Sequence, residues 1–312
     1  MAERWTAAAI TPQHGKRYIV TGANSGLGLE TTIALAASGA QVIMACRTPS
    51  RAEPALAEVR RRVPQAQVAF MPLDLADLAS VRAFAEAYLR EHNRLDGLIN
   101  NAGVMALPFQ KTRDGFEMQI GTNHFGHFAL TGLLFECLRA TPQSRIVTVA
   151  SLAHRWTRGL DLDDPHFTRR PYNKWDAYSK SKLANLVFTF ELDRRLRAAG
   201  IDIVAVAAHP GYSATNLMFV GPAQERSALG RLVMRIGNAL FSQSAAMGAL
   251  PILYAATAAD VRSGDYIGPD GWRELRGYPR KVGCRRSARD PKLGARLWAL
   301  SEQATGVRYL SA

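Results

Sequence analysis

A short apolar strand that runs into a glycine-rich turn and then into a helix most strongly constrains the fold of this 312-residue chain. Residues 16–20 have the character of a buried strand, residues 21–28 supply the turn, and apolar residues at helical spacing follow as far as Gly39. Glycines let the backbone approach a ligand closely, and the first turn of a helix presents unpaired N–H groups and the positive end of its dipole. The sequence therefore predicts a phosphate cradle at the start of an α/β sheet.

Strands and helices continue to alternate after this turn, as they do in a parallel sheet. Further strands are predicted at 41–46, 68–71, 95–99, 145–150 and 201–208, and helices at 81–92, at 116–138 and around Tyr178. The strand at 201–208 is almost wholly apolar, which is typical of a sheet covered on both faces. We expect a doubly wound parallel α/β sheet of the Rossmann type, whose core spans about residues 16–215.

Periodicity weakens beyond residue 215. Helices are expected at 229–241 and 245–256, a short strand at 265–267, and a final helix that starts at Pro291 with Asp290 as its cap and runs to Leu300. Neither an internal repeat nor a linker separates this part from the rest. We expect residues 1–312 to form one domain, in which residues 216–312 make a largely helical C-terminal extension that serves as a substrate lid.

Composition limits the class of protein. Hydrophobic residues make up 47% of the chain and charged residues 21%, which is ample for a sizeable core. The three cysteines lie far apart without metal-ligand spacing, so neither a metal site nor a disulfide framework is expected, and a reducing compartment fits best. No apolar run approaches the roughly 20 residues that a membrane-spanning helix needs. We expect a cytoplasmic protein without a transmembrane segment.

The net charge of +13 raises the question of a nucleic-acid partner. The basic residues gather in short clusters, above all between Arg273 and Lys292, and no nucleic-acid-reading motif accompanies them. We therefore expect no nucleic-acid partner. Peripheral contact with an anionic membrane, attraction of an acidic cofactor and formation of a homo-oligomer are left open.

The end of the strand at 41–46 bears on the choice of dinucleotide. Dinucleotide-binding folds generally place a carboxylate about 20 residues beyond the glycines, where it binds a free ribose 2′-hydroxyl. No acid occurs between Glu30 and Glu53, and Arg47 follows the strand instead. Because a guanidinium favours a 2′-phosphate, NADP(H) is preferred over NAD(H). The simpler alternative is a solvated arginine at a strand end.

Tyr178 and Lys182 form a second constellation. At positions i and i+4 of a helix their side chains lie on one face with Cβ atoms about 5–6 Å apart, whereas Lys180 points elsewhere. A nearby ammonium favours the phenolate and lowers the pKa of a tyrosine from near 10 toward neutrality. The pair is a candidate proton-transfer centre, although the same spacing also occurs on ordinary surface helices.

Other polar residues follow the predicted strands directly. Asp74, the pair Asn100-Asn101 and Ser151 each come after a strand, and the turn at 209–215 follows the last strand of the core. Ligands of open α/β sheets bind at the carboxyl ends of the strands. These residues are therefore expected at one edge, together with the glycine turn.

These residues resemble the short-chain dehydrogenase/reductase family over about residues 16–215. Three motifs carry the resemblance: Thr21-Gly22-x-x-x-Gly26-x-Gly28, Asn100-Asn101-Ala102-Gly103 and Tyr178-x-x-x-Lys182. In addition, Ala45-Cys46-Arg47, residues 122–128 and Ser151-Leu152-Ala153-His154 look like the retinol-dehydrogenase-like branch, which includes the WW-domain oxidoreductase and light-dependent protochlorophyllide reductase. That branch is largely NADP-dependent and favours apolar carbonyls or alcohols. Unlike the microsomal retinol enzymes, the chain is expected to carry no N-terminal membrane anchor, and the segment after Thr215 points to no particular substrate.

The resemblance implies an NADP(H)-dependent oxidoreductase that moves a hydride between nicotinamide and an apolar ketone, aldehyde or alcohol. Tyr178 would exchange a proton with the substrate oxygen, and Lys182 would lower its pKa and hold the nicotinamide ribose. Ser151 would hydrogen-bond the substrate oxygen, and Asn123 would support a water beside Lys182. The predicted cofactor-binding residues are Gly22, Asn24, Ser25, Gly26, Leu27, Gly28, Arg47, Asp74, Leu75, Asn101, Ala102, Gly103, Tyr178, Lys182, Pro210, Gly211 and Thr215.

Two alternatives stay open at this point. A nucleotide-binding regulatory or scaffold protein would keep the fold and lose catalysis, but the complete set of Ser151, Tyr178 and Lys182 counts against it. An epimerase or dehydratase would use the same tyrosine and lysine on a sugar nucleotide. Its relatives usually have a differently spaced glycine turn, so the simple dehydrogenase is preferred.

Overall fold

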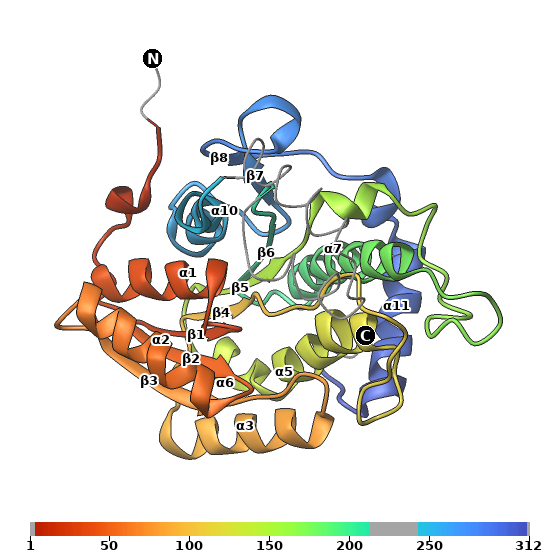
Figure 1. The fold of residues 1–312 in the computed structure, drawn as a ribbon, viewed down its shortest axis with the longest axis horizontal. Helices are drawn as coiled ribbons and strands as arrows, with labels where there is room; N and C mark the ends of the chain where they lie inside the picture. Colours follow the sequence, from red (N-terminus) through yellow and green to blue (C-terminus); the bar gives the residue numbers. More distant parts are fainter. Residues whose placement is uncertain (1–3, 213–242, 311–312) are drawn as a thin grey trace, which may run out of the picture.

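A computed structural model describes residues 4–212 and 243–310 of the chain. Over these residues, eight strands form one sheet in the order β3-β2-β1-β4-β5-β6-β7-β8, parallel except for β8, which runs antiparallel to β7. Helices cover both faces of the sheet (Figure 1). The predicted doubly wound, single-domain Rossmann fold is confirmed.

The elements have the following bounds. The strands are β1 (Arg17–Thr21), β2 (Gln41–Cys46), β3 (Gln67–Pro72), β4 (Gly97–Asn100), β5 (Ser144–Val149), β6 (Ile203–Ala208), β7 (Tyr266–Pro269) and β8 (Pro279–Lys281). The α-helices are α1 (Gly26–Ala37), α2 (Pro49–Arg62), α3 (Leu78–Glu91), α4 (Met118–Ile120), α5 (Gly126–Leu133), α6 (Phe135–Arg139), α7 (Lys174–Ala198), α10 (Ala245–Thr257) and α11 (Pro291–Thr305). A π-helical turn spans Gly121–Phe125, and short 3-10 turns span Ala7–Ala9, Leu152–Arg155, Trp272–Glu274 and Arg286–Arg289.

Alternating side chains of the central strand reach two separate cores. Ile19 of β1 joins a cluster built with α3, α5, α7 and α11, whereas its neighbours Tyr18 and Val20 join a cluster built with α1, α2 and α10. The period-2 geometry of a strand makes this division obligatory once both faces are covered. It also explains the apolar composition of β2, β5 and β6, which have no solvent-facing side.

The strand order reverses between β1 and β4. The chain moves outward from β1 to β2 and β3, then returns to β4 on the other side of β1 and continues toward β8. A crevice forms at such a switch point, outside the carboxyl ends of the strands. The glycine turn after β1 and the Asn101-Ala102-Gly103 turn after β4 therefore meet where a dinucleotide fold binds its ligand.

The single long helix predicted at 116–138 is wrong. The segment forms α4, the π-helical turn, α5 and α6, and the last break falls at Leu134, which leaves helical geometry with ψ at 1°. Gly126 lies so close to the segment after β3 that an added Cβ would be 2.4 Å from the carbonyl oxygen of Leu75. This long-range contact, which local periodicity does not encode, fixes the path of the chain here.

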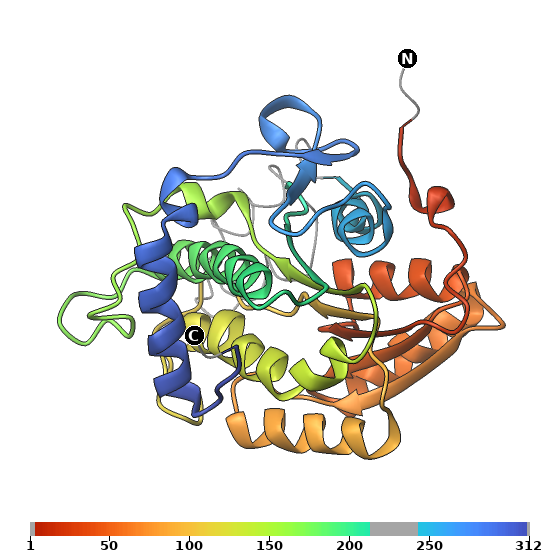
Figure 2. The same ribbon diagram turned by 180° about the vertical axis from the view of Figure 1, so that it is seen from behind.

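The described part of the C-terminal extension belongs to the main fold. Helix α10 packs against α1, β7 and β8 lengthen the sheet, and α11 packs against α7 (Figure 2). Asp290 caps α11 as predicted, with its carboxylate accepting from Lys292 N–H at 2.9 Å. The helix predicted at 229–241 lies outside the described residues, and the role of the extension as a lid stays a prediction.

Within 4–212 and 243–310, no helix combines the length and apolar character that crossing a membrane requires.

Candidate active site

The turn between β1 and α1 forms a cradle made of backbone. Gly22 and Gly26 adopt φ values of 67° and 54°, in the left-handed region that favours glycine. A Cβ on Gly28 would lie 2.4 Å from the carbonyl oxygen of Gly22. The side chain of Ser25 makes no capping hydrogen bond at the start of α1, so it leaves the N–H groups of the first turn to other partners. This open helix terminus, beside two glycines at which a Cβ would crowd the neighbouring backbone, suits the pyrophosphate of a dinucleotide.

The 101–103 turn after β4 is bonded directly to this cradle. The Thr21 hydroxyl accepts hydrogen bonds from the backbone N–H groups of Asn101 and Ala102, both at 2.9 Å. In return, the Asn101 side chain donates to the Thr21 carbonyl at 2.7 Å. A Cβ on Gly22 would lie only 3.0 Å from the Cα of Ala102. The structure thus brings these two groups of predicted cofactor residues together.

His127 supports the same region, although sequence analysis gave it no role. Its Nδ1 lies 3.0 Å from the carbonyl oxygen of Asn123, which only accepts, so Nδ1 carries the proton. The other nitrogen, Nε2, lies 2.9 Å from the hydroxyl of Thr21 and accepts from it. The ring thereby links β1 to the π-helical turn. Its spacing of four residues from Asn123 is the only sequence signal for this link.

Arg47 and Asp74 lie together at the carboxyl ends of β2 and β3. The closest approach, from Arg47 Nη1 to Asp74 Oδ2, is 4.0 Å, and the arginine side chain is 66% exposed. Exposed pairs of this kind contribute about 0–1 kcal/mol, so little energy opposes rotation of the guanidinium toward another anion. Behind Arg47, the backbone N–H groups of Ala23 and Asn24 hydrogen-bond the Cys46 sulfur, although burial still raises the pKa of this thiol to about 11.

Tyr178 and Lys182 are both buried on α7, with 5% and 3% of their surface exposed. Asn173 caps the start of the helix, and its side chain accepts from the N–H of Trp175 at 3.0 Å. Lys182 Nζ donates to the carbonyl oxygen of Val149, the last residue of β5, at 2.9 Å. Burial lowers the pKa of Lys182 from 10.5 to about 8. The lysine therefore exchanges protons closer to neutrality than a solvated one does.

The effect predicted for Lys182 on the Tyr178 pKa is not what the structure shows. Burial raises the pKa of Tyr178, and the hydrogen bond with Ser151 opposes this rise. The hydroxyl is therefore protonated at neutral pH, because desolvation disfavours the phenolate. As predicted, Lys180 points away from the pair: its Nζ lies 2.6 Å from Asp176 and 5.0 Å from the centre of the Phe167 ring.

The other two predicted catalytic residues, Ser151 and Asn123, lie close to Tyr178 and Lys182. Ser151 lies two residues beyond the end of β5, and its hydroxyl hydrogen-bonds Tyr178 and accepts from Ala153 N–H at 3.2 Å. Asn123 lies in the π-helical turn, a feature frequent at functional sites. A Cβ on Gly103 would lie 3.1 Å from the Asn123 side-chain oxygen and 3.5 Å from Lys182 Nζ. Gly103 therefore lies between the side chains of Asn123 and Lys182.

Asn123 is held by three hydrogen bonds. Its side-chain oxygen accepts from the Val104 N–H at 2.8 Å, and its amide donates to the Val104 carbonyl at 2.9 Å and to the Ser181 hydroxyl at 2.8 Å. These bonds join the turn after β4 to α7. Whatever else Asn123 does, its geometry fixes the backbone between the cofactor cradle and Lys182.

The last predicted cofactor residues follow β6 at the same edge of the sheet. Gly211 adopts a φ of 66°, and the Pro210 carbonyl accepts from the side-chain amide of Gln243 at 2.7 Å. Thr215 lies outside the described residues. Leu75 lies beside the π-helical turn, where its carbonyl faces Gly126. All the predicted site residues that the structure describes therefore gather along the carboxyl edge of β1 to β6.

Three histidines in and behind the site predict marked acid sensitivity. Burial lowers the pKa of His124 to about 3 and those of His127 and His154 to about 4. A folded-state pKa below the unfolded value of 6.5 gives stability that is present above pH 6.5 and lost as pH falls. Each ring lowers the free energy of unfolding by roughly 1.4 kcal/mol for each pH unit below 6.5. The three rings together therefore give a slope of about 4 kcal/mol per pH unit. Urea unfolding should show the free energy of unfolding falling steeply from pH 6.5 to pH 5, and His124→Asn should reduce this slope by about 1.4 kcal/mol per pH unit. A flat profile over that range would contradict the neutral, buried state of these rings.

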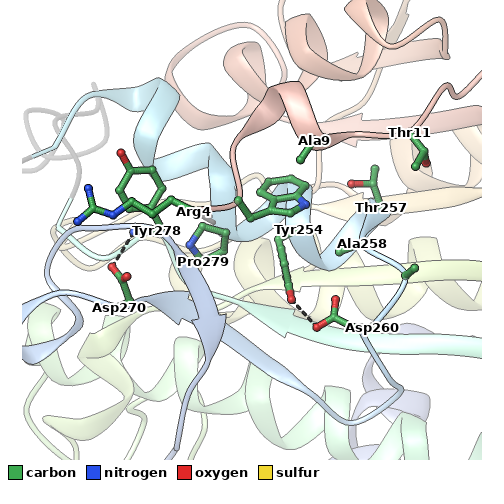
Figure 3. Close-up of a pocket in the computed structure, with 12 residues that line it drawn as sticks. Arg4, Ala9, Thr11, Tyr254, Thr257, Ala258, Asp260, Asp270, Tyr278 and Pro279 are labelled. Carbon is green, nitrogen blue, oxygen red and sulfur yellow. Dashed lines mark hydrogen bonds between the residues drawn. The ribbon is translucent and has the colours of Figure 1, made fainter. Parts of the chain in front are cut away.

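A cavity elsewhere on the molecule carries none of the predicted chemistry. It has a volume of about 580 Å³ and lies between the N-terminal segment, the end of α10 and the β7–β8 hairpin (Figure 3). Aromatic rings line it: Trp5 packs edge-on against Tyr254, Arg4 lies over Tyr278, and Tyr254 donates to Asp260 at 2.6 Å. None of its lining residues belongs to the predicted site.

Comparison with known proteins agrees with the residues and geometry of the site. Residues 16–161 match the family model described as short chain dehydrogenase. Retinol dehydrogenase 14 of Mus musculus is 41% identical over 306 residues, which cover 94% of this chain and 87% of that protein. Retinol dehydrogenase 13 of Homo sapiens is 41% identical over 300 residues, covering 94% and 85%. A solved structure of an uncharacterized protein from Mycobacterium Paratuberculosis is 44% identical, with a TM-score of 0.80 and coverage of 98% of this chain and 99% of that chain. The chain therefore belongs to the short-chain dehydrogenase/reductase family of oxidoreductases, in its retinol-dehydrogenase-like branch.

Proposed function

We propose that the protein is an NADP(H)-dependent oxidoreductase that interconverts an apolar ketone or aldehyde and its alcohol by hydride transfer. The observation that carries this proposal is the convergence of Ser151, Tyr178 and Lys182 beside the glycine cradle. The relatives named as retinol dehydrogenases support an apolar alcohol as the substrate class.

The nicotinamide, when bound, supplies the hydride in reduction and accepts it in oxidation. Tyr178 is protonated at neutral pH, so it gives its hydroxyl proton to the carbonyl oxygen during reduction and takes the proton back from the alcohol during oxidation. Ser151 hydrogen-bonds the same oxygen, and Lys182 holds the nicotinamide ribose. Asn123 fixes the backbone next to Lys182 and supports a water there.

The cofactor fits a continuous set of backbone turns. Residues 22–28 would hold the pyrophosphate, and Arg47 the 2′-phosphate. Asp74 and Leu75 would lie toward the adenine end, and residues 101–103 and 210–211 would lie toward the nicotinamide end. Thr215 is proposed to join the nicotinamide end.

Location in the cytoplasm and the absence of a nucleic-acid partner stay predictions, and homo-oligomer formation and peripheral membrane contact stay open.

A regulatory protein that binds the nucleotide without turnover is the rival from another class. It needs neither the buried lysine nor the tyrosine next to Ser151, and the burial of the lysine ammonium is unfavourable. An epimerase or dehydratase would keep the pair, but the spacing of Gly22, Gly26 and Gly28 favours the simple dehydrogenase.

The function is tested by turnover of a panel of apolar aldehydes and ketones with NADPH or NADH, and of retinol with NADP⁺ or NAD⁺, followed by nucleotide absorbance. We expect turnover with NADPH or NADP⁺ to exceed turnover with NADH or NAD⁺. Arg47→Ala should raise the Kd for NADPH about 10- to 100-fold, the equivalent of one or two charge-assisted hydrogen bonds, and leave the Kd for NADH nearly unchanged.

Arg139→Ala is the matched control for this test, because Arg139 is an exposed arginine paired with Glu136 on α6. It should change neither Kd. Equal affinity of the wild-type protein for NADPH and NADH would overturn the assignment of NADP(H). Tight NADPH binding without turnover across the whole panel would favour the regulatory rival.

A further inference from the structure

One carboxylate of the C-terminal extension bridges the two chain segments that flank the proposed catalytic centre. Both oxygens of Glu274 lie 3.0 Å from Nη2 of Arg155, and Oε2 lies 3.1 Å from Nε2 of His209. Arg155 ends the short turn that follows Ser151, and His209 follows β6 and precedes the turn at 210–211. Glu274 comes from the loop between β7 and β8, more than 60 residues away from either partner in the chain.

The hydrogen bonds of His209 define which ring nitrogen carries its proton. The ring is fully buried, and the backbone N–H of Gly211 donates to Nδ1 at 3.2 Å, so Nδ1 is the acceptor. Nε2 must then carry the hydrogen and donate it to Glu274. Burial lowers the pKa of His209, which keeps the ring neutral in this tautomer. The carboxylate thus orients the ring, and the ring holds the amide of Gly211.

The backbone beside Glu274 contacts the same turn. The carbonyl oxygen of Leu275 accepts from Tyr212 N–H at 2.7 Å. A Cβ on Gly211 would lie 2.4 Å from that oxygen and 2.9 Å from the carbonyl oxygen of Glu274. The turn after β6 is therefore packed so closely against the 274–275 backbone that no side chain larger than glycine fits at position 211.

The loop is strained where it presents the carboxylate. Arg273 and Glu274 have φ values of 51° and 61°, which residues other than glycine rarely adopt. Burial raises the pKa of Glu274, but hydrogen bonds from His209 and Arg155 outweigh this effect and lower it to about 2. A charged carboxylate held by the buried His209 and the more exposed Arg155 is the compensation that keeps this conformation.

We propose that Glu274 is a positioning residue of the active site: through His209 and Arg155 it holds the Gly211 amide and the segment after Ser151 where the nicotinamide end of the cofactor binds. The inference rests on the proposed function, in which the 210–211 turn contacts the cofactor. Glu274 itself touches neither Tyr178 nor Lys182 and acts only through its two partners.

Glu274→Gln is the test variant. Its amide oxygen still accepts from His209, but the negative charge and the second acceptor for Arg155 are lost. We expect the Kd for NADPH to rise at least about tenfold, the equivalent of one lost hydrogen bond to a charged group. Amide hydrogen exchange over residues 203–212, measured without nucleotide, should accelerate. The KM for NADPH should rise more than kcat falls at saturating NADPH, because the proton-transfer residues are untouched.

Glu191→Gln is the matched control. Glu191 is a buried carboxylate on α7 that binds Arg194 and Arg195, each at 2.7 Å, and touches no residue of the site. This variant loses the same charge from another carboxylate that is bonded to arginine. It should lower the free energy of unfolding and leave both the Kd for NADPH and the exchange of residues 203–212 as in the wild type.

The outcomes separate this inference from the proposed function. If wild type and Glu274→Gln bind NADPH equally and exchange equally over 203–212, the positioning role is overturned while the function stands. If the wild type does not bind NADPH, the proposed function fails, and the exchange measurement alone decides whether Glu274 holds the turn. If Glu274→Gln does not fold, Arg155→Gln, which changes the 40% exposed partner, takes its place with the same readouts. Wild-type values in that variant overturn the proposal as well.

Discussion

Replacing Tyr178 with phenylalanine should lower the turnover of an apolar carbonyl with NADPH by about 10³-fold, the scale of a lost general acid. The change removes one hydroxyl from a ring that is only 5% exposed, so the packing of α7 is retained. The hydrogen bond with Ser151 is lost, but the residues that would bind the cofactor keep their side chains. NADPH affinity should therefore stay close to that of the wild type, and kcat rather than KM should carry the effect.

Tyr88→Phe is the control for this experiment. Tyr88 is fully buried on α3 and donates its hydroxyl to the Arg94 carbonyl at 2.7 Å, far from the site in the fold. This variant loses a comparable buried hydrogen bond and should keep its turnover. Near-wild-type turnover of correctly folded Tyr178→Phe would rule out the tyrosine as the proton donor, whatever the cofactor affinity.

The parts of the site that could be predicted are those with a local signal. The glycine turn needs three glycines within seven residues, and Tyr178 and Lys182 need only the spacing of one helical turn. The parallel order of the strands brings Ser151 to the same edge, because β5 and β6 end side by side. Chain order and local pattern therefore placed the described catalytic residues together without any knowledge of tertiary contacts.

The parts that could not be predicted depend on contacts between distant segments. Glu274 bonds Arg155 across 119 residues of sequence, and nothing in its own surroundings signals this contact. Strand β8 consists of a proline and two charged residues, and it pairs only because β7 supplies an edge. The close approach of Gly126 to Leu75, within the segment expected to form one helix at 116–138, is also a contact between distant segments.

The direction of the Tyr178 pKa was the most consequential miss. Spacing on α7 shows that a cation is near the phenol, but it does not show how much water remains around either group. The structure buries both, and desolvation is the largest effect on the pKa of each group. A motif thus predicts which groups interact, whereas the depth of burial decides which protonation state they favour.

The same burial makes the Lys182 ammonium unfavourable for the stability of the fold. Lys182→Met should therefore stabilise the protein while abolishing turnover. The drop in its pKa from 10.5 to about 8 corresponds to roughly 3 kcal/mol of penalty for keeping the ammonium buried. Because the folded-state pKa lies below the unfolded one, this penalty is complete below pH 8 and disappears as pH rises toward 10.5. Methionine fills a similar volume, and Val149 keeps a hydrogen bond from the Asn185 amide at 3.1 Å. We expect a gain on the order of 1–3 kcal/mol in urea unfolding at pH 7.

Lys180→Met, two residues away on the same helix, separates this effect from a general benefit of removing positive charge. Lys180 pairs with Asp176 at 2.6 Å, so its loss should leave stability unchanged or lower it, with turnover retained. The gain for Lys182→Met should also shrink as the pH of the unfolding experiment is raised from 7 to 10, because the wild-type lysine is then neutral in the folded state. A destabilised Lys182→Met at pH 7 would show that the hydrogen bond to Val149 outweighs the desolvation of the ammonium. The site would then hold its lysine for stability, whereas the geometry indicates that the protein keeps it for catalysis at the expense of stability.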